Sequence, residues 1–139
     1  MHTAQMISTH PDVDGAMSDR LVRCIDECHA CAQACLSCAD ACLAEEMVQS
    51  LRQCIRLNLD CADICEAVGR IASRRTGSDE HLLRDVLEVC AAACDRCAEE
   101  CERHADKHAH CEICAGACRA CAAACREARE DVMPGAARH

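Results

Sequence analysis

The sequence contains no Phe, Tyr or Trp, and its Leu, Ile and Val residues together number only 22, about 16% of the chain. So low a content is by itself typical of disordered proteins, which cannot bury enough apolar surface to offset the entropy lost on folding. A conventional aromatic and aliphatic core is therefore excluded. Any folded core has to use other small residues, and we expect it to be only thinly apolar in the metal-free protein.

Clustered positive charge and long apolar runs are also lacking. The formal net charge is −9 and no basic cluster is present, which argues against a nucleic-acid partner. The longest apolar runs span only a few residues, too few to cross a membrane. The segment Met1–Gln5 has neither the cationic start nor the apolar stretch of a secretory signal. We therefore expect a cytoplasmic protein of one domain whose thiols stay reduced.

Cysteine is what the sequence has in excess: 18 residues, about 13% of the chain. A free Cys packs as a small apolar group, so periodic Cys and Ala can supply the missing core. From Cys24 to Cys42 the cysteines follow one another at steps of 4, 3, 4, 3 and 4 residues. These steps keep side chains on one stripe of an α-helix. Six thiols are therefore predicted to project from one face of one long helix.

The same spacing recurs along the chain and predicts four helices. The first spans about residues 13–45 and the second about residues 48–73. In the second helix, Asn58 occupies a position at which the pattern would place another Cys. The third helix begins at an expected N-cap, Ser78. A turn within residues 105–109 separates it from the fourth.

Short connections between amphipathic helices favour an all-α fold, an antiparallel up-down-up-down four-helix bundle with a Cys-lined core. We assign residues 13–133 to this bundle. Residues 1–12 form an N-terminal arm with a short helix lying on the bundle, and residues 134–139 form a C-terminal tail, because Pro134 and Gly135 stop the last helix.

Antiparallel packing gives the bundle two chemically different ends. One end is predicted to collect aliphatic side chains and Met17, which we call the plug: Met17, Leu21, Val68, Ile71, Leu83, Val86, Leu87 and Val132. The other end is predicted to collect softer polar side chains, which we call the mouth: Cys42, Met47, Cys54, His104, His108 and Cys111. The mouth is the natural way into the core.

Sixteen of the cysteines form eight Cys-x-x-x-Cys pairs. Residues four apart on a helix have Cβ atoms about 5–6 Å apart. A disulfide needs Cβ atoms about 3.5–4.5 Å apart, so these pairs are poorly placed to oxidise within a helix. A metal between two sulfurs spans about 4.5 Å, if each metal–sulfur bond is about 2.3 Å as for zinc. The spacing therefore favours a two-coordinate metal over a disulfide.

The identity of the metal follows from softness and charge. Thiolates select Cu(I), zinc or iron–sulfur clusters. Filling the core with Cys₄ zinc sites would bury roughly four dianionic centres, which is costly. Cu(I) with one bridging thiolate per metal is neutral overall, and it gives a load on the order of 18 ions. Each thiol must lose its proton, so loading should release protons and weaken as the pH falls.

The chain resembles the four-helix-bundle copper storage proteins, in particular their cytosolic branch. The resemblance lies in the Cys-x-x-x-Cys rows on four helices, the lack of aromatic residues and the histidines at one end. The resemblance covers about residues 17–125. It implies storage and buffering of many Cu(I) ions, which limits copper toxicity or supplies cuproenzymes. It also implies a homotetramer, and exchange of copper with a copper chaperone or a small thiol.

The resemblance further implies which side chains hold copper. All 18 cysteines are expected to be Cu(I) ligands, and Asn58, His104 and His108 are expected to be auxiliary ligands near the mouth. The cysteines are Cys24, Cys28, Cys31, Cys35, Cys38, Cys42, Cys54, Cys61, Cys65, Cys90, Cys94, Cys97, Cys101, Cys111, Cys114, Cys118, Cys121 and Cys125.

Other interpretations stay open from the residues alone. If the argument for Cu(I) from softness and charge fails, the alternatives are a thiol redox protein and a protein that binds several zinc ions or iron–sulfur clusters. No nucleophile–base set, phosphate-binding Gly loop or carboxylate pair predicts an enzyme. Asn58 can be a tolerated polar residue, and Met17 and Met47 are expected to pack rather than bind metal. His29 and His110 fall off the stripe and are expected on the surface, as are the Glu and Arg residues between the thiols.

Overall fold

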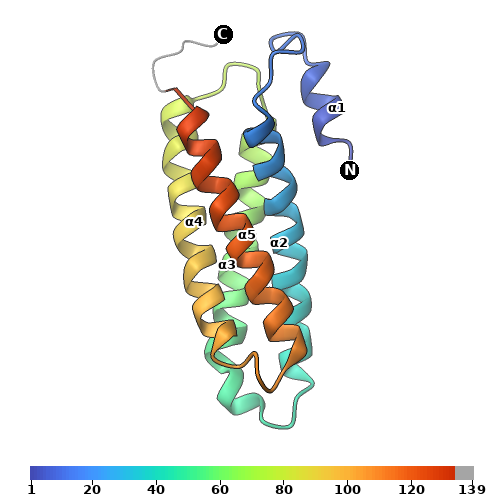
Figure 1. Ribbon diagram of the computed structural model, residues 1–139, viewed down its shortest axis with the longest axis vertical. Helices are drawn as coiled ribbons and strands as arrows, with labels where there is room; N and C mark the ends of the chain where they lie inside the picture. The colour runs from blue at the N-terminus through green and yellow to red at the C-terminus, as the bar shows by residue number, and fades with distance from the viewer. Residues whose placement is uncertain (134–139) are drawn as a thin grey trace.

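The computed structural model describes residues 1–133, and there it is all-helical, with four long helices and two short ones (Figure 1). The predicted antiparallel four-helix bundle is confirmed. Along the chain the elements are α1 (Thr3–Ser8), α2 (Asp19–Leu43), the 3₁₀ helix η1 (Val48–Leu51), α3 (Arg52–Ser73), α4 (Glu80–Glu102) and α5 (Ala109–Asp131).

The four long helices form a square. Helix α2 packs against α3 and α5, and α4 packs against the same two, so that α2 faces α4 and α3 faces α5 across the diagonals. The α2–α3 and α4–α5 connections lie together at one end, drawn at the bottom of Figure 1. The α3–α4 connection and α1 lie at the opposite end. Within the described residues, no helix is both long enough and apolar enough to span a bilayer.

The first long helix begins later than predicted. Asp14 and Gly15 have positive φ values of 48° and 80°, which are incompatible with a continuing right-handed helix. Ser18 follows in an extended conformation, and its side chain accepts a hydrogen bond from the Leu21 amide, so it is the N-cap of α2. Residues 13–17 are consequently not part of the helix.

Other predicted helix boundaries also shift. The N-cap of α4 is Asp79, whose carboxylate accepts from the Leu82 amide, so the assignment of Ser78 was wrong; Ser78 instead donates to the Glu80 carboxylate at 2.7 Å. The turn after α4 begins at residue 103, before the predicted range 105–109. The predicted tail, with its stop at Pro134 and Gly135, lies outside the described residues.

Helix α1 joins the bundle through one side chain. Ile7 is buried in the main core, whereas the neighbouring Met6 is exposed. The short helix packs against α2 near the end that carries the α3–α4 connection (Figure 1). Ile7 thereby adds to the few branched aliphatic side chains that the core contains.

The plug forms as predicted at the end opposite the α2–α3 and α4–α5 connections. Five of its side chains are buried, and Met17, Ile71 and Val86 pack against them while partly exposed. The five buried ones are Leu21, Val68, Leu83, Leu87 and Val132. With so few large apolar side chains in the protein, each of these should carry a large share of the hydrophobic stabilisation.

We expect Leu87→Ala to lower the free energy of unfolding of the metal-free protein by about 2–5 kcal/mol, the usual effect of truncating a buried leucine. The control is Leu82→Ala in the same helix, because the Leu82 side chain is 47% exposed. That variant should change stability by less than about 0.5 kcal/mol. Urea unfolding followed by circular dichroism in a reducing buffer measures both values. Equal effects of the two substitutions would contradict the assignment of the plug.

Candidate metal centre

All 18 cysteines point into the bundle, and each is free and fully or almost fully buried. The cause is local: steps of three and four residues place every thiol on the stripe that each helix turns toward its neighbours. Alanines such as Ala32, Ala62, Ala98 and Ala122 are buried between them. The core is therefore a sulfur column flanked by methyl groups.

The sulfur atoms meet on the bundle axis. The Sγ atoms of Cys28 and Cys90 are 4.0 Å apart although α2 and α4 stand on one diagonal of the square. On the other diagonal, the Sγ atoms of Cys65 in α3 and Cys121 in α5 are 3.9 Å apart. Contacts across both diagonals require that sulfurs from all four helices share the central line.

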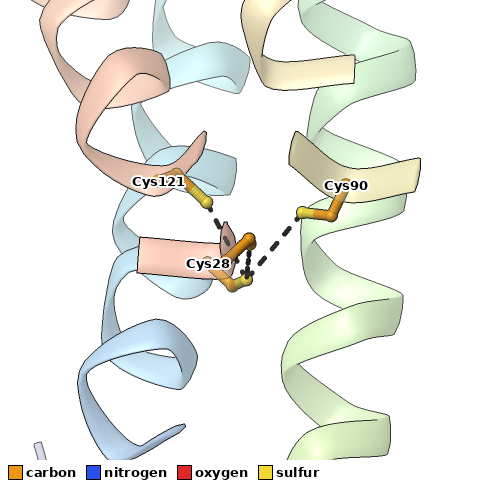
Figure 2. A group of neighbouring side chains, drawn as sticks. Cys28, Cys90 and Cys121 are labelled. Carbon is orange, nitrogen blue, oxygen red and sulfur yellow. Dashed lines mark hydrogen bonds between the residues drawn. The ribbon is translucent and has the colours of Figure 1, made fainter. Parts of the chain in front are cut away.

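Figure 2 shows one such meeting point, in which Cys28, Cys90 and Cys121 come from α2, α4 and α5. The Cys28 sulfur lies 3.8 Å from that of Cys121 and 3.9 Å from that of Cys125. These distances are shorter than the roughly 4.5 Å span of a linear sulfur–metal–sulfur unit. Small rotations of the side chains are enough to admit a metal between them.

Sets of four sulfurs repeat along the column, each with all its Sγ atoms within 4.8 Å of one another. Five of these sets are Cys28/Cys90/Cys121/Cys125, Cys31/Cys65/Cys94/Cys121, Cys31/Cys35/Cys61/Cys118, Cys35/Cys97/Cys114/Cys118 and Cys38/Cys42/Cys54/Cys111. Four cysteines belong to two of these sets: Cys31, Cys35, Cys118 and Cys121. Four of the five sets therefore overlap one another in sequence along the column, and the fifth, at the mouth, shares no cysteine with them.

The closest contacts between helices are shorter than those within one helix. The sulfurs of the i, i+4 pair Cys31 and Cys35 are 3.9 Å apart, whereas those of Cys24 and Cys125, in α2 and α5, are 3.5 Å apart. The sequence pattern singled out the pair within a helix as the unit of metal binding. In the structure such pairs lie within larger sets of sulfurs, each drawn from three or four helices.

Close packing makes neighbouring thiols share protons. Interaction with Cys125 and then with Cys28 lowers the pKa of Cys24 to about 5, and interaction with Cys101, with help from Cys54 and His110, lowers that of Cys38 to about 5. Neighbouring thiols shift the other way: interaction with Cys121 raises the pKa of Cys28, and interaction with Cys114 raises that of Cys101. The column thus holds protonated thiols beside sulfurs that favour the thiolate form.

Asn58 stands in the sulfur column itself. It is fully buried, and its Oδ1 atom accepts from the thiols of Cys97 at 3.0 Å, Cys114 at 3.3 Å and Cys101 at 3.5 Å. Its Nδ2 atom lies 3.8 Å from the Cys54 sulfur. The amide therefore takes the place that the sequence pattern would give to a cysteine, with an oxygen directed at the same neighbours.

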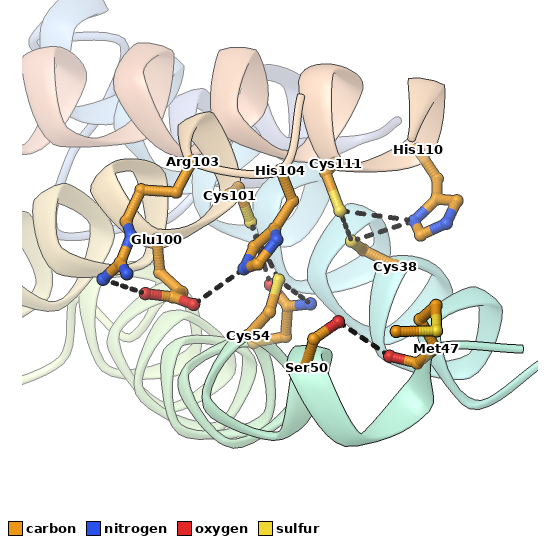
Figure 3. A network of polar contacts seen from close by, with 11 residues as sticks. Cys38, Met47, Ser50, Cys54, Glu100, Cys101, Arg103, His104, His110 and Cys111 are labelled. Atoms are coloured by element: carbon orange, nitrogen blue, oxygen red, sulfur yellow. Dashed lines mark hydrogen bonds and ion pairs between the residues drawn. The ribbon is translucent and has the colours of Figure 1, made fainter. Parts of the chain in front are cut away.

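The mouth contains a histidine that the sequence analysis placed on the surface. The Nδ1 atom of His110 lies 3.4 Å from the Cys38 sulfur and 3.7 Å from the Cys111 sulfur (Figure 3). Its Nε2 atom lies 2.8 Å from a Glu45 carboxylate oxygen. Burial opposes protonation of His110, but Cys38 and Glu45 outweigh it and raise its pKa. The expectation of a surface residue was therefore wrong.

His104 and His108 lie at the same end of the bundle, partly buried, with ring nitrogens on carboxylates. His104 Nε2 lies 2.9 Å from Glu100, and His108 Nδ1 lies 3.1 Å from Glu45. The rings of His108 and His110 stack with centroids 5.5 Å apart. The sequence pattern brings His104 and His108 to the mouth, but their role as copper ligands stays a prediction.

Other expectations about single side chains have mixed outcomes. Glu100 is only 7% exposed, so the reading of every Glu between the thiols as part of a solvated face was wrong for this residue. His29 lies away from the column, 3.6 Å from the Glu66 carboxylate. Met47 is 68% exposed at the mouth, whereas Met17 packs against the core as expected.

The burial of the thiols predicts how the metal-free protein reacts with a water-soluble disulfide such as Ellman's reagent. In the folded protein the 18 thiols should react slowly, because none offers its sulfur to solvent. After unfolding in urea, all 18 should react rapidly, because none is held in a disulfide. A fast native reaction with many thiols, or a shortfall after unfolding, would contradict the buried column.

Comparison with known proteins agrees with this geometry. The family model described as copper storage protein (Csp) matches residues 17–130. Among curated proteins the comparison finds no match.

Solved structures resemble the chain over most of its length. The copper storage protein Ccsp from Streptomyces lividans, loaded with 10 copper equivalents, has 46% sequence identity and a TM-score of 0.88, covering 94% of this chain and 99% of its own. A structure of a cytosolic copper storage protein from the same organism, with five coppers, has 51% identity and a TM-score of 0.79, covering 81% and 93%. The Cu(I)-bound copper storage protein BsCsp3 has 38% identity and a TM-score of 0.67, covering 75% and 92%.

Proposed function

This chain belongs to the copper storage protein family, and from that premise we propose that it stores and buffers Cu(I) on its sulfur column, at roughly one ion per thiol. The observation that carries the proposal is the overlap of the four-sulfur sets along the axis. A ligand that bridges two metals must belong to two sets, and four cysteines of the column do. Copper ions in adjacent sets would then be linked through the cysteine that the two sets share.

Charge balance supports copper over zinc. One thiolate neutralises one Cu(I), so the column fills without building up charge in a dry interior. Separate tetrahedral zinc sites would each need four cysteines of their own. Cys31 and Cys118 each belong to two sets, so neighbouring sets cannot all hold zinc at once.

A thiol redox function is less well supported by the same geometry. Redox-active cysteines are accessible thiolates that a substrate can reach. Here the sulfurs are sealed inside the bundle, and even Cys38, at the mouth, is only 1% exposed. A metal ion can reach such a site by passing from ligand to ligand, whereas a disulfide substrate cannot. We therefore propose a storage protein rather than an enzyme.

The proposed ligands are the 18 cysteines, with Asn58, His104 and His108 as auxiliary ligands near the mouth. We propose His110 as a further ligand, because its Nδ1 atom lies beside two sulfurs. The Streptomyces lividans relative is described as cytosolic, and we propose the same compartment here, with a copper chaperone or a small thiol as the exchange partner. A homotetramer stays a prediction.

Anaerobic titration of the reduced protein with Cu(I) should reach saturation at well over ten equivalents, on the order of 18. The double variant Cys31→Ser/Cys118→Ser should bind about two equivalents fewer, because both residues bridge adjacent sets. Ser37→Ala on the exposed face of α2 is the matched control and should bind as much as the wild type. Gel filtration followed by metal analysis measures all three. Saturation at one or two equivalents would overturn the proposal.

Copper loading should release protons and weaken as the pH falls. Burial raises the pKa of the Cys42 thiol to about 11, so at neutral pH this sulfur carries a proton that Cu(I) must displace. Because the proton and the metal compete, lowering the pH favours the protonated thiol and lowers the apparent affinity. A pH indicator in weak buffer measures proton release, and competition with a Cu(I) chelator at several pH values measures affinity. An affinity independent of pH would contradict this account.

A further inference from the structure

We propose that Glu100 and Glu45 are positioning residues, which hold the rings of His104 and His110 so that Nδ1 is the atom each ring offers to copper. The inference rests on the proposed function, since it concerns how copper is received at the mouth. Neither carboxylate is required as a ligand. Each acts through the histidine that it contacts.

Glu100 is an unusual residue for its position. It is the one charged side chain among the buried residues that the structure describes, 7% exposed on a helix whose other acidic residues are less covered. Its Oε2 atom lies 2.9 Å from His104 Nε2, and its Oε1 atom lies 3.3 Å from an Arg103 nitrogen. Figure 3 shows the carboxylate between the guanidinium and the imidazole. Burying a carboxylate is costly unless it is paired, so the two contacts account for its place there.

This contact decides which nitrogen of His104 carries the proton. An ionised carboxylate only accepts hydrogen bonds, so Nε2 must be the donor. In the neutral ring the other nitrogen, Nδ1, then has the free lone pair that a metal requires. Metal-binding histidines commonly donate their second ring nitrogen to a carboxylate in this way, which fixes the tautomer and the orientation of the ring.

His110 repeats the arrangement with a different carboxylate. Its Nε2 atom lies 2.8 Å from Glu45 Oε2, and its Nδ1 atom lies 3.4 Å from the Cys38 sulfur. Here the structure shows where Nδ1 points: toward the sulfur column. Nδ1 has a free lone pair only in the neutral ring, because a protonated His110 donates from both nitrogens. Two histidines from different segments thus each have Nε2 on a carboxylate, and in His110 Nδ1 is visibly the inward atom.

His108 pairs with the same glutamate through its other nitrogen. Its Nδ1 atom lies 3.1 Å from Glu45 Oε2, an ion-pair contact that does not fix its tautomer. The geometry therefore predicts the tautomers of two rings at the mouth. The neutral rings of His104 and His110 carry the proton on Nε2.

Long-range ¹H–¹⁵N correlation spectra of the metal-free, reduced protein test this pattern without any substitution. The pH is raised until the rings are neutral, which takes a higher pH for His110 because Cys38 and Glu45 raise its pKa. The two nitrogen shifts of each neutral ring then report its tautomer. The expected result is the Nε2–H form for His104 and His110. A wild-type His104 in the Nδ1–H form would overturn the proposal.

The rate of copper loading tests the consequence. Glu100→Ala should let the His104 ring take both tautomers and should slow the capture of Cu(I) by about 10- to 100-fold, the usual effect of losing such a partner. Glu100→Gln keeps an acceptor oxygen for Nε2 and should restore most of the rate and the wild-type tautomer. Glu99→Ala is the matched control, because Glu99 is the exposed neighbour on the same helix. Stopped-flow absorption of the Cu(I)–thiolate band follows each variant.

A double-mutant cycle separates positioning from a general effect on folding. If Glu100 acts through His104, then Glu100→Ala should slow loading no further in a His104→Ala background. Independent, additive losses in the two variants would overturn the proposal, as would loading of Glu100→Ala at the wild-type rate with unchanged tautomers. The final copper content should stay the same in all these variants. A low content in the wild type itself would instead count against copper storage.

Discussion

Contact between sulfur atoms on the bundle axis is the constraint from which the other features follow. Sγ atoms 3.9–4.0 Å apart across both diagonals require the four helices to stand close together. Branched or aromatic side chains on the same stripe would hold the helices apart, which accounts for their absence from the column. The fully or almost fully buried aliphatic side chains larger than alanine are those of the plug together with Ile7, Ile25 and Leu51.

A dry column of thiols also determines where polar groups can stand. Asn58 is tolerated inside because three thiols donate to its oxygen and a sulfur lies beside its nitrogen. His104, His108 and His110 stand with their carboxylates at the end where the α2–α3 and α4–α5 connections meet. Glu45, in the first of these connections, contacts His108 at the end of the second and His110 in the first turn of α5. The mouth is thus a product of the fold rather than of one helix.

The contrast between a periodic sulfur column and a mouth built from two connections explains what the sequence could and could not predict. Steps of three and four residues fix which side of a helix a thiol occupies, so the bundle, the column and the plug followed from periodicity. Helix starts depend on single residues, such as Asp14 with its positive φ and Asp79 as a cap, which periodicity does not register. His110 lies off the stripe, yet from the first turn of α5 its Nδ1 atom reaches the Cys38 sulfur, a contact that periodicity does not predict. Burial of Glu100 likewise depends on the position of its neighbours, although its place four residues before His104 was a usable signal.

The thin core and the storage function are two aspects of one arrangement. A column of small thiols contributes less hydrophobic stabilisation than the branched residues it replaces, so the metal-free bundle depends on the plug and on weak sulfur contacts. A metal that binds the folded column but not the unfolded chain stabilises the fold by mass action. Each ion that bridges cysteines of different helices, such as Cys28 in α2 and Cys90 in α4, also links those helices to each other. The stored copper therefore stabilises the bundle as an aliphatic core stabilises other proteins. The column can accept metal because small thiols, rather than large aliphatic side chains, occupy it.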